Sequence, residues 1–198
     1  MERLILARHG ESDYSARGLV NGEPEAGVGL TERGKEEARA LGRALVGEPL
    51  DLCVVTPLPR TRATAELALL GRSVPCEVVP GLADPRAGRF EGRRLDEYRT
   101  WAWTAGSGEP APGGGESRLA VVGRYAESYR GLLARGERTI LAIAHALPIA
   151  YLLLALEGTA PRPKVGLEIR HAHPYSLSVS QLEAALGVVE DWLEDPTW

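Results

Sequence analysis

Residues 4–12 read Leu-Ile-Leu-Ala-Arg-His-Gly-Glu-Ser, and this stretch indicates how the rest of the chain is arranged. The apolar run 4–7 is typical of a strand buried on both faces. It stops at Arg8 and His9, and Gly10 permits a sharp turn. Ligands of open α/β sheets bind at the carboxyl ends of the strands, so Arg8 and His9 are candidate site residues. For an isolated pair, a solvated Arg–His cap is the more common explanation.

The composition is that of an ordinary globular protein. The chain has 198 residues, of which 44% are hydrophobic and 25% charged, and its formal net charge is −4. This length predicts one domain over residues 1–198, with a small cap region around residues 84–116. The negative charge gives no general attraction to nucleic acid or to an anionic membrane. Cys53 and Cys76 are too few for a disulfide framework, and Cys53 lies in an apolar run that predicts a buried thiol.

No targeting or membrane-spanning segment is expected. The chain shows no charged leader followed by a long apolar stretch. Its longest apolar run, 146–156, contains Pro148 and is too short to cross a bilayer. A cytoplasmic location is therefore the expectation.

Strand and helix patterns alternate through the first half of the chain. Thr31 is a predicted N-cap, and the apolar residues that follow it recur at helical spacing. Predicted strands cover residues 52–55 and 74–79, predicted helices cover 61–70 and 95–103, and the segments 10–30, 81–92 and 105–115 are predicted loops.

The second half continues the alternation. It predicts a helix over 117–134, a strand over 139–144 that ends at His145, a helix over 147–156, an edge strand over 175–179 and a terminal helix over 181–194. Ser180 and Glu183 form a candidate capping box for the last helix. The order predicts a three-layer α/β/α sandwich around a mostly parallel sheet.

Basic residues follow three of the predicted strands. Arg8 and His9 end the first strand, Arg60 comes shortly after the second, and His145 directly follows the fourth. If these strands are parallel and adjacent, the four side chains converge. Guanidinium forks bind phosphate oxygens bidentately and stay charged at physiological pH, so phosphate is the anion that suits the site best.

Imidazole adds reactivity to such a site. A neutral ring nitrogen can attack phosphorus and hold a phosphoryl group, provided that a partner such as a backbone carbonyl orients the other nitrogen. Departure of the leaving group requires a protonated carboxyl nearby. Asp84 and Glu91 are the candidates, and Asp84 is preferred because it lies closer to the end of the third predicted strand.

An ordered set of motifs resembles the histidine phosphatase superfamily, in its phosphoglycerate-mutase-like branch. The set spans roughly residues 3–150. It comprises Leu-Ala-Arg8-His9-Gly10-Glu11-Ser12, Leu30-Thr31-x-x-Gly34, Thr56-Pro-Leu-Pro-Arg60-Thr-x-Ala63-Thr64-Ala65, Gly88-x-Phe-Glu91-Gly92, Pro112-Gly-Gly-Gly-Glu116-Ser117 and Ala144-His145. A lone Arg-His-Gly is a weak signal, whereas the ordered set is highly specific.

The resemblance implies a role for each matching residue. His9 would be the nucleophile that accepts the phosphoryl group, and Arg8, Arg60 and His145 would hold that group. Asp84 falls at the position of the family's proton donor, where many members have the longer Glu.

The loop after the first motif departs from the family. Ser15 stands, after Tyr14, where Asn often follows an aromatic residue. Asn21 is a possible substitute as a phosphate ligand, and Ser12 is a further candidate through its hydroxyl.

The predicted function is hydrolysis of a small phosphorylated metabolite through a phosphohistidine, with no metal or organic cofactor. A phosphoglycerate-type mutase is the first alternative, although it needs lid segments for which 198 residues leave little room. A non-catalytic phospholigand-binding module is the second. His171 and His173 have a spacing that could bind a metal on a strand, but no Cys, Asp or Glu cluster accompanies them. The sequence predicts neither the substrate nor the oligomeric state.

Overall fold

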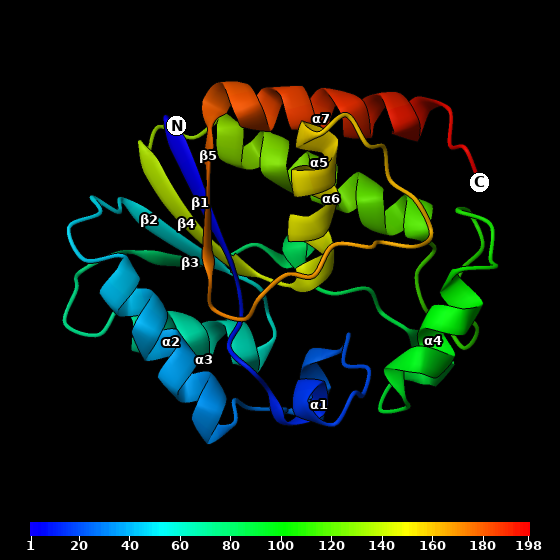
Figure 1. The fold of residues 1–198 in the computed structure, drawn as a ribbon, viewed down its shortest axis with the longest axis horizontal. Helices are drawn as coiled ribbons and strands as arrows, with labels where there is room; N and C mark the ends of the chain where they lie inside the picture. The colour runs from blue at the N-terminus through cyan, green and yellow to red at the C-terminus, as the bar shows by residue number, and fades with distance from the viewer.

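The computed structural model describes residues 1–198, and its centre is a five-stranded sheet in the order β3-β2-β4-β1-β5 (Figure 1). The strands are β1 (Arg3–Arg8), β2 (Leu52–Val55), β3 (Cys76–Val78), β4 (Thr139–Ala144) and β5 (Pro174–Ser178). The first four are parallel, whereas β5 pairs antiparallel with β1. The mostly parallel sheet of the predicted α/β fold is confirmed.

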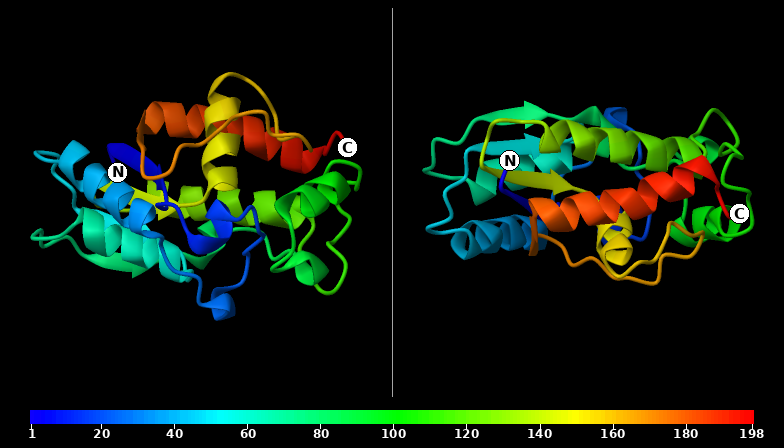
Figure 2. Two further views of the ribbon diagram at one scale, coloured as in Figure 1. Left: turned by 60° about the horizontal axis from the view of Figure 1, so that its bottom comes forward. Right: turned by 90° about the horizontal axis from the view of Figure 1, so that it is seen from above.

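Helices cover both faces of this sheet and form the outer layers of the sandwich. In Figures 1 and 2, α2 (Glu32–Ala44) and α3 (Pro59–Ala68) lie on one face, and α5 (Arg118–Leu133), α6 (Ala146–Leu156) and α7 (Val179–Glu194) lie on the other. The short α1 (Asp13–Ala16) and α4 (Leu95–Ala102) lie beyond the carboxyl ends of the parallel strands (Figure 1). No helix is both long and apolar enough to span a membrane.

The side chains of β1 alternate between two hydrophobic cores. Leu4 and Leu6 belong to a cluster of 26 buried residues on the side of α5, α6 and α7. Ile5 and Ala7 belong to a cluster of 13 on the side of α2 and α3. The opening run is therefore apolar throughout because both faces of the strand are buried.

Gly10 serves close packing rather than the sharp turn expected from the sequence. It has no positive φ. A Cβ at Gly10 would lie 2.3 Å from the carbonyl oxygen of Gly34, and a Cβ at Gly34 would lie 2.0 Å from the carbonyl oxygen of Glu11. The two glycines let the chain after β1 pass directly against the first turn of α2.

Several predicted boundaries are wrong. The expected loop 10–30 contains α1 and the 3-10 helix Pro24–Ala26, and the third strand is only Cys76–Val78. The terminal helix begins at Val179, and its capping box is Ser178 with Gln181 rather than Ser180 with Glu183. The shift occurs because β5 runs directly into α7, so the last strand residue is also the N-cap.

Candidate active site

His9 directly follows β1, and both of its ring nitrogens have partners. Nδ1 lies 2.7 Å from the carbonyl oxygen of Gly10, and Nε2 accepts a hydrogen bond of 3.0 Å from Nε of Arg60. These partners assign the proton to Nδ1 and leave a lone pair on Nε2. Burial, Arg60 and the neighbouring His145 and Arg8 lower the pKa of His9 well below its usual value, so the ring is neutral at pH 7.

Arg60 joins the other site residues to one another. It lies in the first turn of α3 and is 2% exposed. Besides His9, its guanidinium donates to Oδ1 of Asn21 at 3.1 Å, to the carbonyl oxygen of Asn21 at 2.9 Å and to Oδ2 of Asp84 at 2.7 Å. Burial lowers the pKa of Arg60 and Asp84 opposes that shift, and the guanidinium remains a cation at physiological pH.

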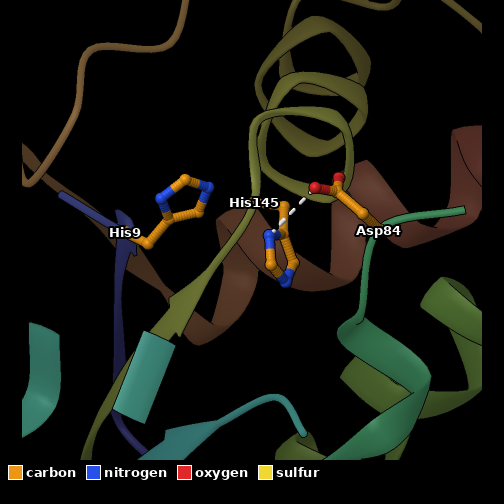
Figure 3. A group of neighbouring side chains, drawn as sticks. All are labelled: His9, Asp84 and His145. Atoms are coloured by element: carbon orange, nitrogen blue, oxygen red, sulfur yellow. Dashed lines mark ion pairs between the residues drawn. The ribbon is translucent and has the colours of Figure 1, made fainter. Parts of the chain in front are cut away.

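His145 lies beside His9 because their strands are neighbours. It is the N-cap residue of α6, directly after β4, and its ring centroid is 5.3 Å from that of His9. Nε2 lies 2.9 Å from Oγ1 of Thr56, and Nδ1 lies 3.1 Å from Oδ2 of Asp84 (Figure 3). Burial lowers the pKa of His145 to about 4, so this ring is also neutral at pH 7.

Asp84 approaches the imidazoles from the loop that follows β3 (Figure 3). Burial raises its pKa, but His145 and Arg60 outweigh burial and hold the pKa well below its usual range. The carboxylate is thus ionised in the free site. Its side chain is 28% exposed, whereas those of Arg60 and His145 are 3% and 0% exposed. Of these three groups, Asp84 is therefore the one nearest the solvent side.

Glu91, the alternative proton donor, is engaged elsewhere. One carboxylate oxygen accepts from the backbone N–H of Ala87 at 2.8 Å and the other from that of Gly22 at 2.9 Å. Burial raises the pKa of Glu91. Both carboxylate oxygens of Glu91 are occupied by backbone N–H groups of loops, so the geometry favours Asp84 over Glu91 as the candidate proton donor.

Two buried donors near Arg60 have no protein partner. Arg8 donates from one terminal nitrogen to the carbonyl oxygen of Ile169 at 3.0 Å, while its Nε has no partner. Asn21 accepts from Arg60, while its Nδ2 has none. Buried donors are nearly always satisfied, so this pair points to an anionic ligand. Asn21 thus lies where a phosphate ligand is expected.

Ser12 differs from the expectation. Its hydroxyl caps α1 by accepting from the backbone N–H of Ser15 at 3.2 Å, and the Ser15 hydroxyl accepts from the backbone N–H of Ser12 at 2.8 Å. The hydrogen bonds of the Ser12 hydroxyl are with Ser15, and none joins it to Arg8, His9 or Arg60. The structure places Ser12 in a capping box, and the same box accounts for Ser15.

The three residues His9, Asp84 and His145 also resemble a ligand set for a metal ion, since their donor atoms lie within 4.8 Å of one another. The charge around them argues against a cation. The Arg60 guanidinium already bonds to His9 and Asp84, and Arg8 contributes to lowering the pKa of both imidazoles. A site with two guanidinium groups suits an anion.

A third imidazole at the site was not predicted. The ring centroid of His171 lies 5.7 Å from that of His9. Since β1 lies between β4 and β5, His171 is on the opposite side of His9 from His145. It lies there because β5 is antiparallel and begins at this edge of the sheet. The backbone at residue 171 forms a bridge with Arg8, and Nδ1 of His171 lies 4.0 Å from a carboxylate oxygen of Glu37. The segment before β5 has no helical or strand periodicity in the sequence, so the position of His171 beside His9 follows only from the topology of the sheet.

The aromatic residues of the cap pack mainly against one another. Tyr98 and Trp101 of α4 contact Phe90, with ring centroids 5.7 and 5.8 Å from it. Trp103 is 43% exposed and lies under the ammonium of Lys164. Mutual packing therefore accounts for Phe90, Tyr98 and Trp101, but not for Trp103.

The fold gathers a cluster of arginine and histidine side chains at the ends of its strands, and comparison with known proteins identifies the family. Residues 4–194 match the family model of the histidine phosphatase superfamily (branch 1). The chain belongs to this superfamily.

Relatives within the superfamily differ in activity. The chain is 33% identical over 187 residues to a 2,3-bisphosphoglycerate-dependent phosphoglycerate mutase of Methylobacterium sp. (strain 4-46), covering 85% of this chain and 88% of the relative. Its structure is similar to a putative alpha-ribazole-5'-P phosphatase from Escherichia coli, with a TM-score of 0.77, 26% identity and coverage of 91% and 92%. It also resembles a mycobacterial glucosyl-3-phosphoglycerate phosphatase solved with VO3, with a TM-score of 0.70, 26% identity and coverage of 90% and 93%.

Proposed function

We propose that the protein is a phosphomonoester hydrolase that acts on a small phosphorylated metabolite through a phosphohistidine at His9. One observation carries the proposal: Nε2 of His9 has a lone pair, and the carbonyl oxygen of Gly10 holds the opposite nitrogen at 2.7 Å. A neutral imidazole oriented in this way is a nucleophile.

In the first step, Nε2 of His9 attacks phosphorus and the bond to the leaving oxygen breaks. The phosphoryl oxygens are held by Arg8, Arg60 and His145, and the two unpartnered donors, Nε of Arg8 and Nδ2 of Asn21, gain acceptors. Donors placed where negative charge develops stabilise the transition state. The substrate phosphate displaces Arg60 from Nε2 of His9, which frees the lone pair.

Asp84 then supplies the proton that the leaving oxygen needs. It is ionised in the free site because Arg60 and His145 stabilise its charge. A phosphate dianion competes for the same two partners and repels the carboxylate, so binding of the substrate raises the pKa of Asp84. In the second step Asp84 takes a proton from the water that attacks phosphorus, and the bond from phosphorus to Nε2 of His9 breaks to release inorganic phosphate.

Substitution of His9 tests the proposal. The wild-type protein should hydrolyse p-nitrophenyl phosphate and form an acid-labile phosphoenzyme, and His9→Ala should lose both while its circular dichroism spectrum is unchanged. Phosphoenzyme retained in His9→Ala would move the nucleophile to His145. Absence of turnover in the wild-type protein on a panel of phosphate esters would favour the non-catalytic binding module.

A phosphoglycerate-type mutase is the second candidate, because the relative from Methylobacterium is named as one. A mutase must keep water from the phosphohistidine and return the phosphoryl group to a bound product. Incubation with 3-phosphoglycerate and its bisphosphate primer separates the two activities. The hydrolase should release inorganic phosphate, whereas formation of 2-phosphoglycerate without phosphate release would assign the mutase.

A further inference from the structure

The two cysteines are direct partners on neighbouring strands. Cys53 of β2 pairs with Cys76 of β3 in the parallel register. Adjacent strands are about 4.8 Å apart, and side chains of paired residues point to the same face. A disulfide needs Cα atoms separated by roughly 4.4–6.8 Å, so this register brings the two backbones within bonding range.

The two thiols differ in their access to solvent. Cys53 is completely buried in the core between the sheet and the helices α2 and α3, whereas Cys76 is exposed on a three-residue strand at the edge of the sheet. The hydrogen bond with the Cys53 thiol, helped by the charge of Arg62, lowers the pKa of Cys76 to about 7. The exposed thiol is thus the one that meets a reagent, and the buried thiol is its only neighbouring partner.

We propose that Cys53 and Cys76 form a redox modification site, at which a low-molecular-weight disulfide converts the two thiols into an interstrand disulfide. The Cys76 thiolate attacks one sulfur of the reagent, the reagent S–S bond breaks, and the mixed disulfide forms with release of one reagent thiolate, which takes a proton from water. Sγ of Cys53 then attacks Sγ of Cys76, the bond from Cys76 to the reagent sulfur breaks, and the proton of Cys53 passes to that sulfur as the second reagent thiol leaves. Two protein thiols are oxidised and one reagent disulfide is reduced to two thiols.

The bond would tie together the two strands that lead into the active site. The loop after β2 leads to Arg60, the loop after β3 leads to Asp84, and these side chains pair at 2.7 Å. Because the partners are already in register, we expect the disulfide to form with little movement of either loop. We therefore expect kcat/KM to stay within about twofold, since no hydrogen-bond donor of the site is displaced. The loop closed by the bond contains α3, so Tm should rise by about 5–10 °C.

Oxidised glutathione at pH 7.5 tests the site, with intact mass, Tm and kcat/KM on p-nitrophenyl phosphate as readouts. The monomer should lose the mass of two hydrogen atoms and show a peptide linking Cys53 to Cys76. Its Tm should rise, and dithiothreitol should reverse both changes. Cys76→Ser should not react. Cys53→Ala should retain one glutathione on Cys76, because no second thiol resolves the adduct.

Three results would overturn the proposal. These are an unreacted wild-type protein, a glutathione adduct that persists on Cys76 of the wild-type protein, and a disulfide that joins two molecules. The mass readout does not depend on catalysis, so it stands even if the protein hydrolyses none of the esters tried.

Discussion

At the scale of single residues, Asp84 carries the most specific expectation. In the proposed mechanism Asp84 donates a proton to the leaving oxygen, so its loss should matter most when the leaving group is a poor one. Asp84→Asn should slow hydrolysis of alkyl phosphates by about 10² or more, the usual size of general-acid catalysis. Phosphorylation by p-nitrophenyl phosphate should slow much less, because nitrophenolate departs without a proton.

Glu91→Gln is the matched control for Asp84→Asn. The Glu91 carboxylate binds backbone N–H groups of Gly22 and Ala87, so its loss should lower thermal stability without altering the dependence on the leaving group. Pre-steady-state phosphorylation rates on the two ester classes measure the difference. Equal slowing of both classes by Asp84→Asn would remove Asp84 from the proton-donor role.

The second prediction concerns the forked guanidinium group of Arg60. Its nitrogens reach His9, Asn21 and Asp84 at the same time, which a single ammonium group cannot reproduce. Arg60→Lys should therefore raise the activation free energy by about 2 kcal/mol or more, comparable to the loss of an oxyanion donor. The ratio of kcat/KM values measures the cost. A variant close to wild type would show that the fork makes no contact in the transition state.

The four basic residues of the site were predicted from the sequence, whereas the places of Ser12 and His171 around them were not. Arg8 ends a strand, and His9, Arg60 and His145 follow strands. The apolar pattern of these strands is visible in the sequence, and their parallel order brings the four residues together. Ser12 could not be assigned from its place in the motif, because a local capping box competes for its hydroxyl. His171 was considered only as a metal ligand with His173, and its place beside His9 could not be predicted, because the antiparallel strand that follows it returns from far along the chain.

At the scale of elements, the contact between the chain after β1 and α2 depends on Gly34. A Cβ there would lie 2.0 Å from a backbone oxygen, so one of the two segments must move. Gly34→Ala should reduce the free energy of unfolding by about 1–3 kcal/mol, the usual cost of overpacking. Urea titration measures the loss. Because the displaced segment carries His9, kcat/KM should fall as well.

Gly29→Ala is the control for Gly34→Ala. A Cβ at Gly29 has no neighbour within 4 Å, and its φ is not positive. This variant should be close to wild type in both stability and activity. If Gly34→Ala were equally stable, α2 would be free to shift away from the end of β1.

The boundaries of helices and strands were predicted correctly where local signals mark them and incorrectly where they depend on other parts of the structure. The strand 139–144 and the N-cap Thr31 were predicted correctly, because buried apolar runs and capping residues are local signals. The start of α7 was misplaced because Ser178 ends a strand and caps a helix at once. Gly10 was assigned to a turn because its close packing against Gly34, which is distant in the sequence, cannot be seen in the neighbouring residues.

At the scale of the whole molecule, the buried imidazoles make stability depend on pH. Burial lowers the pKa of His145 to about 4, while the unfolded chain has the ordinary value of about 6.5. Below pH 6.5 the unfolded state therefore binds protons that the folded site excludes, so acidification favours unfolding. His145 alone should lower the free energy of unfolding by about 2 kcal/mol between pH 6.5 and 5.

Urea titrations at pH 7, 6 and 5 check this slope. His9 and His171, whose pKa values are also lowered mainly by burial, add to it in the same direction. The depressed pKa of Asp84 also favours loss of stability in acid, but at lower pH. A free energy of unfolding that stays flat from pH 7 to pH 5 would mean that the imidazoles are protonated in the folded protein.

The order of the strands places the site residues on segments that differ in local stability. His9 and His145 follow the interior strands β1 and β4, whereas Asp84 follows β3, a three-residue strand at the rim with an exposed outer flank. Rim segments open at a smaller free-energy cost than the interior, so amides of β3 should exchange with deuterium well before those of β1 and β4. Each such opening should move Asp84, the proposed proton donor, away from the site while His9, the proposed nucleophile, stays in place. Under the proposed mechanism, a molecule in that state should still accept a phosphoryl group from an aryl ester but should not react with an alkyl ester.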